Sequence, residues 1–150
     1  MYQFTGADDN RALKAEKGMA ATGGKRIHPL TRISRQAMYD AFMRDASDHS
    51  LTASTRVRAA FDALYTACLQ LVDTQDLSAD SGEKFAETVV ARALAAMNLP
   101  GKDASLVSKL AGWVLHVAPL GPLPMSPEEA VALAERVHRT GRKDNAQSDS

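Results

Sequence analysis

Arg44 and His49 are the two residues of this sequence whose types and spacing best suit a chemical reaction. They stand in the run R-D-A-S-D-H, an R-x4-H pair. A histidine can act as a general base, and a neighbouring arginine can stabilise a phosphoryl transition state. The alternative interpretation of the run is a solvated helix end, with Asp45 and Asp48 beside two exposed side chains.

The most basic stretch of the chain contains Lys25, Arg26, Arg32 and Arg35. Such a stretch can contact phosphates, and its binding would then weaken as the salt concentration rises. No aromatic side chains are interleaved with these bases, and the adjoining body of the chain is acidic. A solvated linker is therefore the alternative to a surface that binds nucleic acid or an acidic partner.

The other histidines and the single cysteine add no further site. His116 has no Cys, Asp or second His within a helical turn, as a zinc ligand or a catalytic base would need. Cys68 falls within an apolar stripe, where we expect it to be a small buried hydrophobic residue. We expect no bound metal and no cofactor.

Length, charge and composition exclude several classes of protein. The chain has 150 residues, with 18 Lys and Arg against 18 Asp and Glu, a size that suits one domain. No apolar run approaches the roughly 18 residues that a transmembrane helix needs, and the N-terminus lacks the pattern of a secretion signal. We exclude a transmembrane protein, a disulfide scaffold and a uniformly basic nucleic-acid binder, and we expect a cytoplasmic protein.

The hydrophobic residues of the chain favour an all-α fold. There are 26 Ala and 15 Leu against 9 Val and 2 Ile. Alanine and leucine are strong helix formers, whereas the β-branched and aromatic residues that are typical of strands are scarce. We therefore expect a compact bundle of four or five helices over residues 31–140. Residues 1–30 are expected to form a loose basic arm, and residues 141–150 a short disordered tail.

Five segments repeat apolar residues at spacings of three and four, the pattern of amphipathic helices. They cover about residues 34–46, 55–73, 82–98, 104–117 and 126–140. In the first segment we expect Met38 and Phe42 to face inward. The last segment has a thin apolar face, so we expect it at the edge of the bundle.

Residues that suit helix N-caps precede three of these segments. Thr52, Ser54 or Thr55 can cap the second segment, and Asp103 can cap the fourth. Ser126 with an acid three residues later forms a capping box for the fifth segment.

The run S-T-R-V-R-A-A-F-D-A-L-Y-T-A-C-L-Q-L-V, residues 54–72, is similar to the opening long helix of HEPN-domain proteins. In that superfamily a helix rich in small residues, with an F/Y-x-x-A/L-Y-x-A-A-like core, begins a bundle of four or five helices. Residues 83–99 resemble the helix that follows it, and residues 104–117 resemble the third long helix. The resemblance covers about residues 51–138.

The resemblance implies a helical bundle, frequent homodimerisation, and a role in bacterial toxin–antitoxin or defence systems. Many members of the superfamily are metal-independent ribonucleases with an R-x4-6-H motif on a later helix. Here the only R-x4-H pair, Arg44 and His49, precedes the helix that matches the superfamily's first one. The later run L-A-G-W-V-L-H contains His116 without the upstream arginine, so the resemblance implies a non-catalytic relative.

Three functions are consistent with the sequence. The leading hypothesis is a non-catalytic, HEPN-like module that binds a protein partner or forms a homodimer, without membrane contact. It would act as an accessory, neutralising or assembly component in a bacterial or mobile-element system. The first alternative is a metal-independent ribonuclease that uses Arg44 and His49. The second is a helical nucleic-acid binder that uses the basic N-terminal arm.

Overall fold

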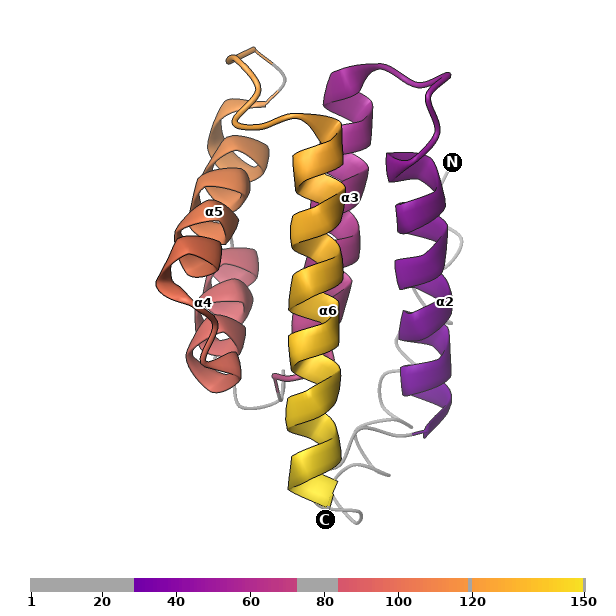
Figure 1. Cartoon of the computed structure of the whole chain (residues 1–150), viewed down its shortest axis with the longest axis vertical. Coiled ribbons are helices and arrows are strands. Elements are labelled where there is room, and N and C mark those ends of the chain that lie inside the picture. The colour runs from indigo at the N-terminus through magenta and orange to yellow at the C-terminus, as the bar shows by residue number, and fades with distance from the viewer. Residues whose placement is uncertain (1–28, 73–83, 119, 150) are drawn as a thin grey trace, which may run out of the picture.

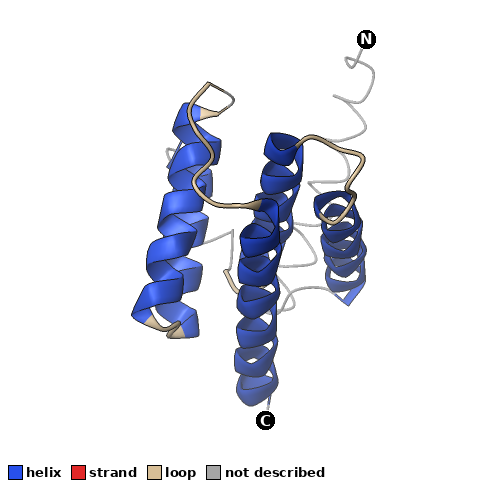
Figure 2. Ribbon diagram, turned by 45° about the horizontal axis from the view of Figure 1, so that its top comes forward, coloured by secondary structure: helices blue, strands red, loops and turns tan. Residues whose placement is uncertain are grey.

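The computed structural model describes residues 29–72, 84–118 and 120–149, with side chains described for residues 31–72, 84–118 and 120–143. These residues form five α-helices and no strand, which confirms the predicted all-α fold (Figure 2). The helices are α2 (Pro29–Ala46), α3 (Ala53–Leu69), α4 (Phe85–Met97), α5 (Gly101–Gly112) and α6 (Pro127–Asp149). A short π-helical segment, η4 (Trp113–Val117), extends α5.

The helices form a bundle in which α3 packs most extensively against α2 and α6. Figure 1 shows α6 in the middle of the view, with α2 on one side and α4 and α5 on the other. The turn between α2 and α3 and the loop before α6 lie at one end of the bundle. The start of α2 and the end of α6 lie at the opposite end. No described helix combines the length and the apolar character needed to cross a membrane.

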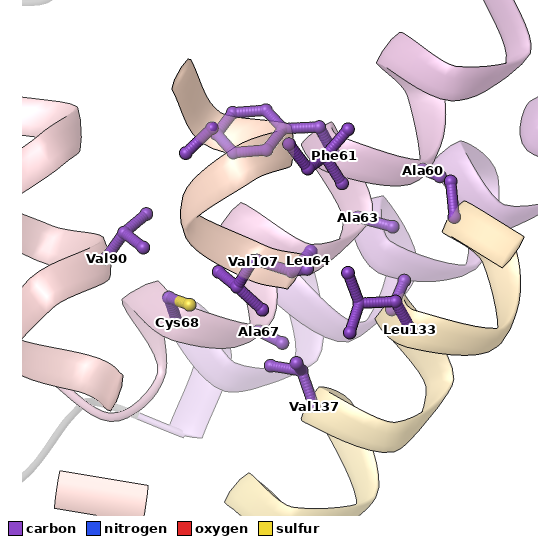
Figure 3. Packing of buried hydrophobic residues seen from close by; sticks show 14 of the residues in the cluster. Ala60, Phe61, Ala63, Leu64, Ala67, Cys68, Val90, Val107, Leu133 and Val137 are labelled. Atoms are coloured by element: carbon purple, nitrogen blue, oxygen red, sulfur yellow. The ribbon is translucent and has the colours of Figure 1, made fainter. Parts of the chain in front are cut away.

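The core is built around α3, whose apolar stripe agrees with the sequence pattern. Val57, Leu64 and Cys68 are fully buried, and Phe61 is almost so (Figure 3). Side chains that recur at spacings of three and four share one helical face, so these residues point together into the bundle. The predicted inward face of residues 55–73 is therefore confirmed, although the helix itself ends at Leu69.

The expected edge position of the last helix is wrong. Four residues of α6 are completely buried: Ala130, Leu133, Ala134 and Val137. They pack against α3, which contributes its own small residues Ala60, Ala63 and Ala67 (Figure 3). The distance between packed helices depends on the side chains at their contact, and small side chains permit a close approach. The thin apolar face is thus a close-packing face at the centre of the bundle.

The last helix is also longer than predicted. It runs through Gly141 to Asp149, so the segment from residue 141, expected to be disordered, continues the helix. At Gly141 a Cβ would lie only 3.0 Å from Cδ1 of Leu71. At this position α6 therefore passes close to the side chain of Leu71, which follows the end of α3.

The inward face of α2 differs from the expected one. Tyr39 and Ala46 are buried and Phe42 is partly buried, but Met38 is 48% exposed. The neighbouring positions Tyr39 and Met38 point about 100° apart on a helix, so a small error in the assumed rotation exchanges their environments.

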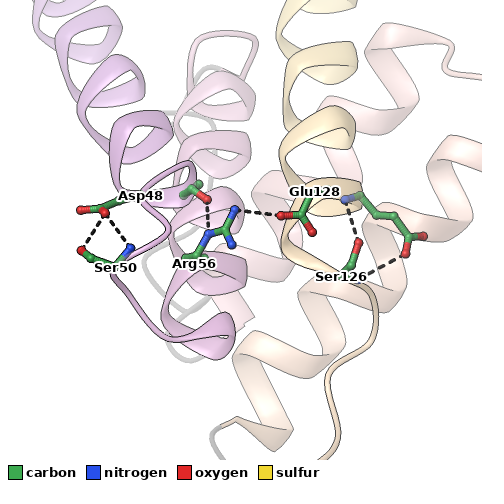
Figure 4. Close-up of polar contacts among 7 residues, drawn as sticks. Asp48, Ser50, Arg56, Ser126 and Glu128 are labelled. Carbon is green, nitrogen blue, oxygen red and sulfur yellow. Dashed lines mark hydrogen bonds and ion pairs between the residues drawn. The ribbon is translucent and has the colours of Figure 1, made fainter.

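Two of the three predicted caps are confirmed. The side chain of Thr52 accepts a hydrogen bond from the backbone N–H of Thr55 at the start of α3. At the start of α6, Ser126 and Glu129 exchange the two hydrogen bonds of a capping box (Figure 4). The third is wrong, because α5 begins at Gly101, before Asp103.

Candidate functional sites

The end of the bundle that holds the α2–α3 turn contains a buried arginine. Arg56 is only 8% exposed, and its Nε donates to the carbonyl oxygen of Ala46 at 2.9 Å. Its Nη2 lies 3.0 Å from Oε2 of Glu128, so one guanidinium joins the end of α2, the start of α3 and the start of α6 (Figure 4). The backbone N–H of Glu128 itself and then Arg56 are the largest of the effects that lower the pKa of Glu128. Through these contacts Arg56 links α2, α3 and α6 at this end of the bundle.

The predicted catalytic pair lies at this same end. Arg44 is exposed in the last turn of α2, and His49 is exposed in the turn that follows. Asp48, next to His49, accepts hydrogen bonds from the side chain and backbone of Ser50, which lower its pKa. A positive charge on His49 lowers the pKa of Asp48 and Glu128 more weakly. The catalytic role of Arg44 and His49 stays a prediction.

The predicted basic surface is only partly within the described residues. Lys25 and Arg26 lie outside them, whereas Arg32 and Arg35 are half-buried near the start of α2. Nη1 of Arg35 donates to the carbonyl oxygen of Leu69 at 2.6 Å, a short charge-assisted hydrogen bond. This bond satisfies a carbonyl at the end of α3 and attaches the start of α2 to it.

A contact between α2 and α6 was not anticipated from the sequence. The rings of Tyr39 and His138 stack with centroids 3.9 Å apart and planes inclined by 13°. Nε2 of His138 donates to Oε1 of Gln36 at 3.2 Å. Burial lowers the pKa of His138, and the charge of Arg142 adds to this effect, while Asp40 opposes it. The described contacts therefore favour the neutral imidazole.

A small cavity lies beside this contact. It is about the size of a water molecule and is lined by Ala67, Gln70, Leu71, His138, Gly141 and Arg142. Nε2 of Gln70 is buried there without a hydrogen-bond partner among the described residues. A water is the largest occupant that such a space can take.

His116 and Cys68 have different surroundings. Nε2 of His116, in η4, pairs with Oε1 of Glu87, in α4, and both side chains remain partly exposed. Cys68 is fully buried, and burial raises its pKa to about 12, so its thiol is protonated. This agrees with the predicted role of Cys68 as a small core residue. Within the described ranges, no three His, Cys, Asp or Glu side chains are grouped so that they could hold one metal ion.

The loop before α6 exposes apolar side chains. Leu120 is 94% exposed, and Val117 and Leu123 are 45% and 38% exposed. No Lys, Arg, Asp or Glu occurs between Lys109 and Glu128 in the sequence. Between these two residues His116, in η4, is the one ionisable side chain, and the loop that follows η4 exposes apolar side chains to the solvent.

The apolar loop contacts the bundle at positions that follow Leu120. Nε1 of Trp113 donates to the carbonyl oxygen of Gly121 at 3.4 Å. A Cβ on Gly121 would clash with Cγ1 of Val117, so only glycine fits this approach without a shift. Met125 is buried at the far end of the loop. These contacts hold the loop backbone at Gly121 and Met125, and the side chain of Leu120, next to Gly121, is exposed.

Comparisons of the chain with protein-family models, with curated proteins and with solved structures find no match. The HEPN resemblance accordingly stays a prediction. A function is therefore proposed from the geometry of the described residues.

Proposed function

We propose that this protein is a non-catalytic helical interaction module that acts by contact with another protein. The observation that carries the proposal is the exposed Leu120, on a loop that the bundle holds in place. The proposed role is that of an accessory, neutralising or assembly component. Its bacterial or mobile-element setting, like its HEPN-like character, rests on the resemblance alone.

An exposed leucine on a fixed loop is well suited to binding. Burying a leucine side chain contributes about 1.5–3 kcal/mol relative to leaving it in water. Ordering a flexible loop would consume part of that gain. Here the Trp113–Gly121 hydrogen bond and the buried Met125 already order the backbone. A larger share of the free energy gained by burying Leu120 therefore contributes to the binding affinity.

Affinity purification from the native host, with the tagged full chain at its endogenous level, tests the proposal. We expect a co-purifying protein whose recovery falls strongly in Leu120→Asp. Met38→Asp is the matched control, because Met38 is also an exposed apolar residue but lies on α2, away from the loop. Recovery of this chain alone, as a monomer, would count against an interaction module.

A ribonuclease assay tests the first alternative. The proposal expects no metal-independent RNA cleavage by the purified chain. Cleavage that is present in the wild type and lost in His49→Ala would overturn the proposal. It would favour the reaction that Arg44 and His49 could perform together.

The nucleic-acid alternative makes a different prediction. Of the two described candidate bases, Arg35 donates to the carbonyl oxygen of Leu69 at the end of α3, and Arg32 lies near the start of α2. Binding through phosphates would weaken steeply as the salt concentration rises. Salt-sensitive RNA or DNA binding that is reduced by Arg32→Ala would favour this alternative over the interaction module.

A further inference from the structure

The two ends of the bundle carry charges of opposite sign along α6. Its first turn exposes Glu128 and Glu129, and its later turns expose Arg139, Arg142 and Lys143. At about 1.5 Å per residue, the two groups lie about 18 Å apart along the helix axis. We call the end with Glu128, Glu129 and Leu120 the head, and the end with Arg139, Arg142, Lys143 and Ile33 the tail.

Each end also exposes at least one large apolar side chain that is more than half exposed. At the head this is Leu120, on the loop that leads directly into the acidic first turn of α6 (Figure 1). At the tail it is Ile33, which is 65% exposed in the first turns of α2. The hydrogen bond between Gln36 and His138 joins this part of α2 to the basic part of α6. Ile33 and the tail bases therefore lie at the same end of the molecule.

We propose that the protein self-associates head to tail, with Leu120 of one copy packing against Ile33 of the next. This inference rests on the proposed function and names a second copy of the chain as a partner. The acids of the head then approach the bases of the tail, and such complementarity favours one relative orientation. Arg44 and Arg58 are also exposed near the head, so the apolar contact carries the association and the charges orient it.

This arrangement has two consequences for the assembly. Each copy uses two different surfaces, so association continues into open chains or rings rather than stopping at a dimer. The exposed apolar surface is also small, because among the residues that the structure describes only Leu120, Val117 and Leu123 contribute to it at the head. A stable interface buries about 800 Å² on each partner. The association is therefore weak and depends on concentration.

Sedimentation velocity of the full chain, from about 10 µM to about 1 mM, tests the proposal. The mean mass of the wild type rises with concentration, and Leu120→Asp and Ile33→Asp each weaken association by about tenfold or more. The decisive sample is a one-to-one mixture of the two variants. Each variant retains one intact surface, so the mixture forms dimers that neither variant forms alone. Met38→Asp behaves like the wild type.

Three outcomes would overturn head-to-tail association. The first is a wild type that stays monomeric throughout the range. The second is a dimer that is lost in Leu120→Asp but retained in Ile33→Asp, which would show that the loop contacts its own copy. The third is a mixture that associates no better than its components. Far-UV circular dichroism verifies folding, and Leu120→Ser and Ile33→Ser replace any variant that fails to fold.

Failure of this inference is distinguishable from failure of the proposed function. A monomeric wild type that still co-purifies with a different protein through Leu120 would reject only the head-to-tail contact. A chain that neither self-associates nor retains a partner would reject both.

Discussion

Nη2 of Arg56 and Oε2 of Glu128 lie 3.0 Å apart, although 72 positions separate the two residues in the chain. Arg56 is buried, whereas the side chain of Glu128 is 66% exposed. The same guanidinium also donates to the carbonyl oxygen of Ala46. Arg56 therefore connects three helices at the end of the bundle that carries the exposed loop.

Arg56→Ala should destabilise the fold by about 1–3 kcal/mol, because it leaves the buried carbonyl of Ala46 without its donor. Glu128→Gln should have a much smaller effect, since an exposed ion pair contributes little. Urea denaturation of the two variants measures this difference. If both variants lose the same free energy of unfolding, the ion pair with Glu128, rather than the hydrogen bond to Ala46, is the main stabilising contact of Arg56.

The fold should lose stability when the pH falls below the ordinary histidine value of 6.5. The pKa of His138 is lowered in the folded state, so the unfolded chain binds a proton more readily. The contribution of His138 is complete above this pH and decreases as the pH falls toward the folded-state pKa. The free energy of unfolding should therefore depend on pH less steeply in His138→Gln. His49→Gln, at an exposed histidine, is the control. If the free energy of unfolding of His138→Gln depends on pH as steeply as that of the wild type, His138 is not the cause of the pH dependence.

Gly141→Ala should stabilise the protein by about 0.5–1 kcal/mol, because alanine is favoured over glycine inside a helix. The new Cβ would meet only Cδ1 of Leu71 closely, at 3.0 Å, and this is the end of a flexible side chain beside a small cavity. A thermal melt measures the effect. A lower melting temperature would mean that Leu71 cannot move and that α6 needs glycine for its approach to α3.

The thiol of Cys68 should resist alkylation in the native protein. It is fully buried, and burial raises its pKa to about 12, whereas the thiolate is the reactive form. Labelling with iodoacetamide should be slow under native conditions and fast in denaturant, which mass spectrometry can follow. Rapid native labelling would show that the core around α3 opens more readily than its packing indicates.

The sequence predicts those features that depend on one helix at a time. The inward face of α3, with Val57 and Leu64, follows from spacing, and the capping box of Ser126 and Glu129 follows from four adjacent residues. Both are local, so no knowledge of the neighbouring helices is needed.

Features that depend on how helices meet were not predictable in the same way. The apolar face of α6 is narrow because it contains Ala130 and Ala134. It packs closely against α3 because α3 also presents alanines at the contact. The burial of Arg56 depends on acceptors from two other helices. The Tyr39–His138 stack joins side chains from the two ends of the described chain. Spacing within one segment carries no information about such pairs.

The native mass of the protein in extract from its host, at endogenous level, tests the central claim most directly. Size-exclusion chromatography with immunodetection would compare the wild type with Leu120→Asp. An interaction module predicts that the wild type elutes in a species larger than one chain and that Leu120→Asp shifts toward the position of a single chain. Elution of both proteins as single chains would contradict the account.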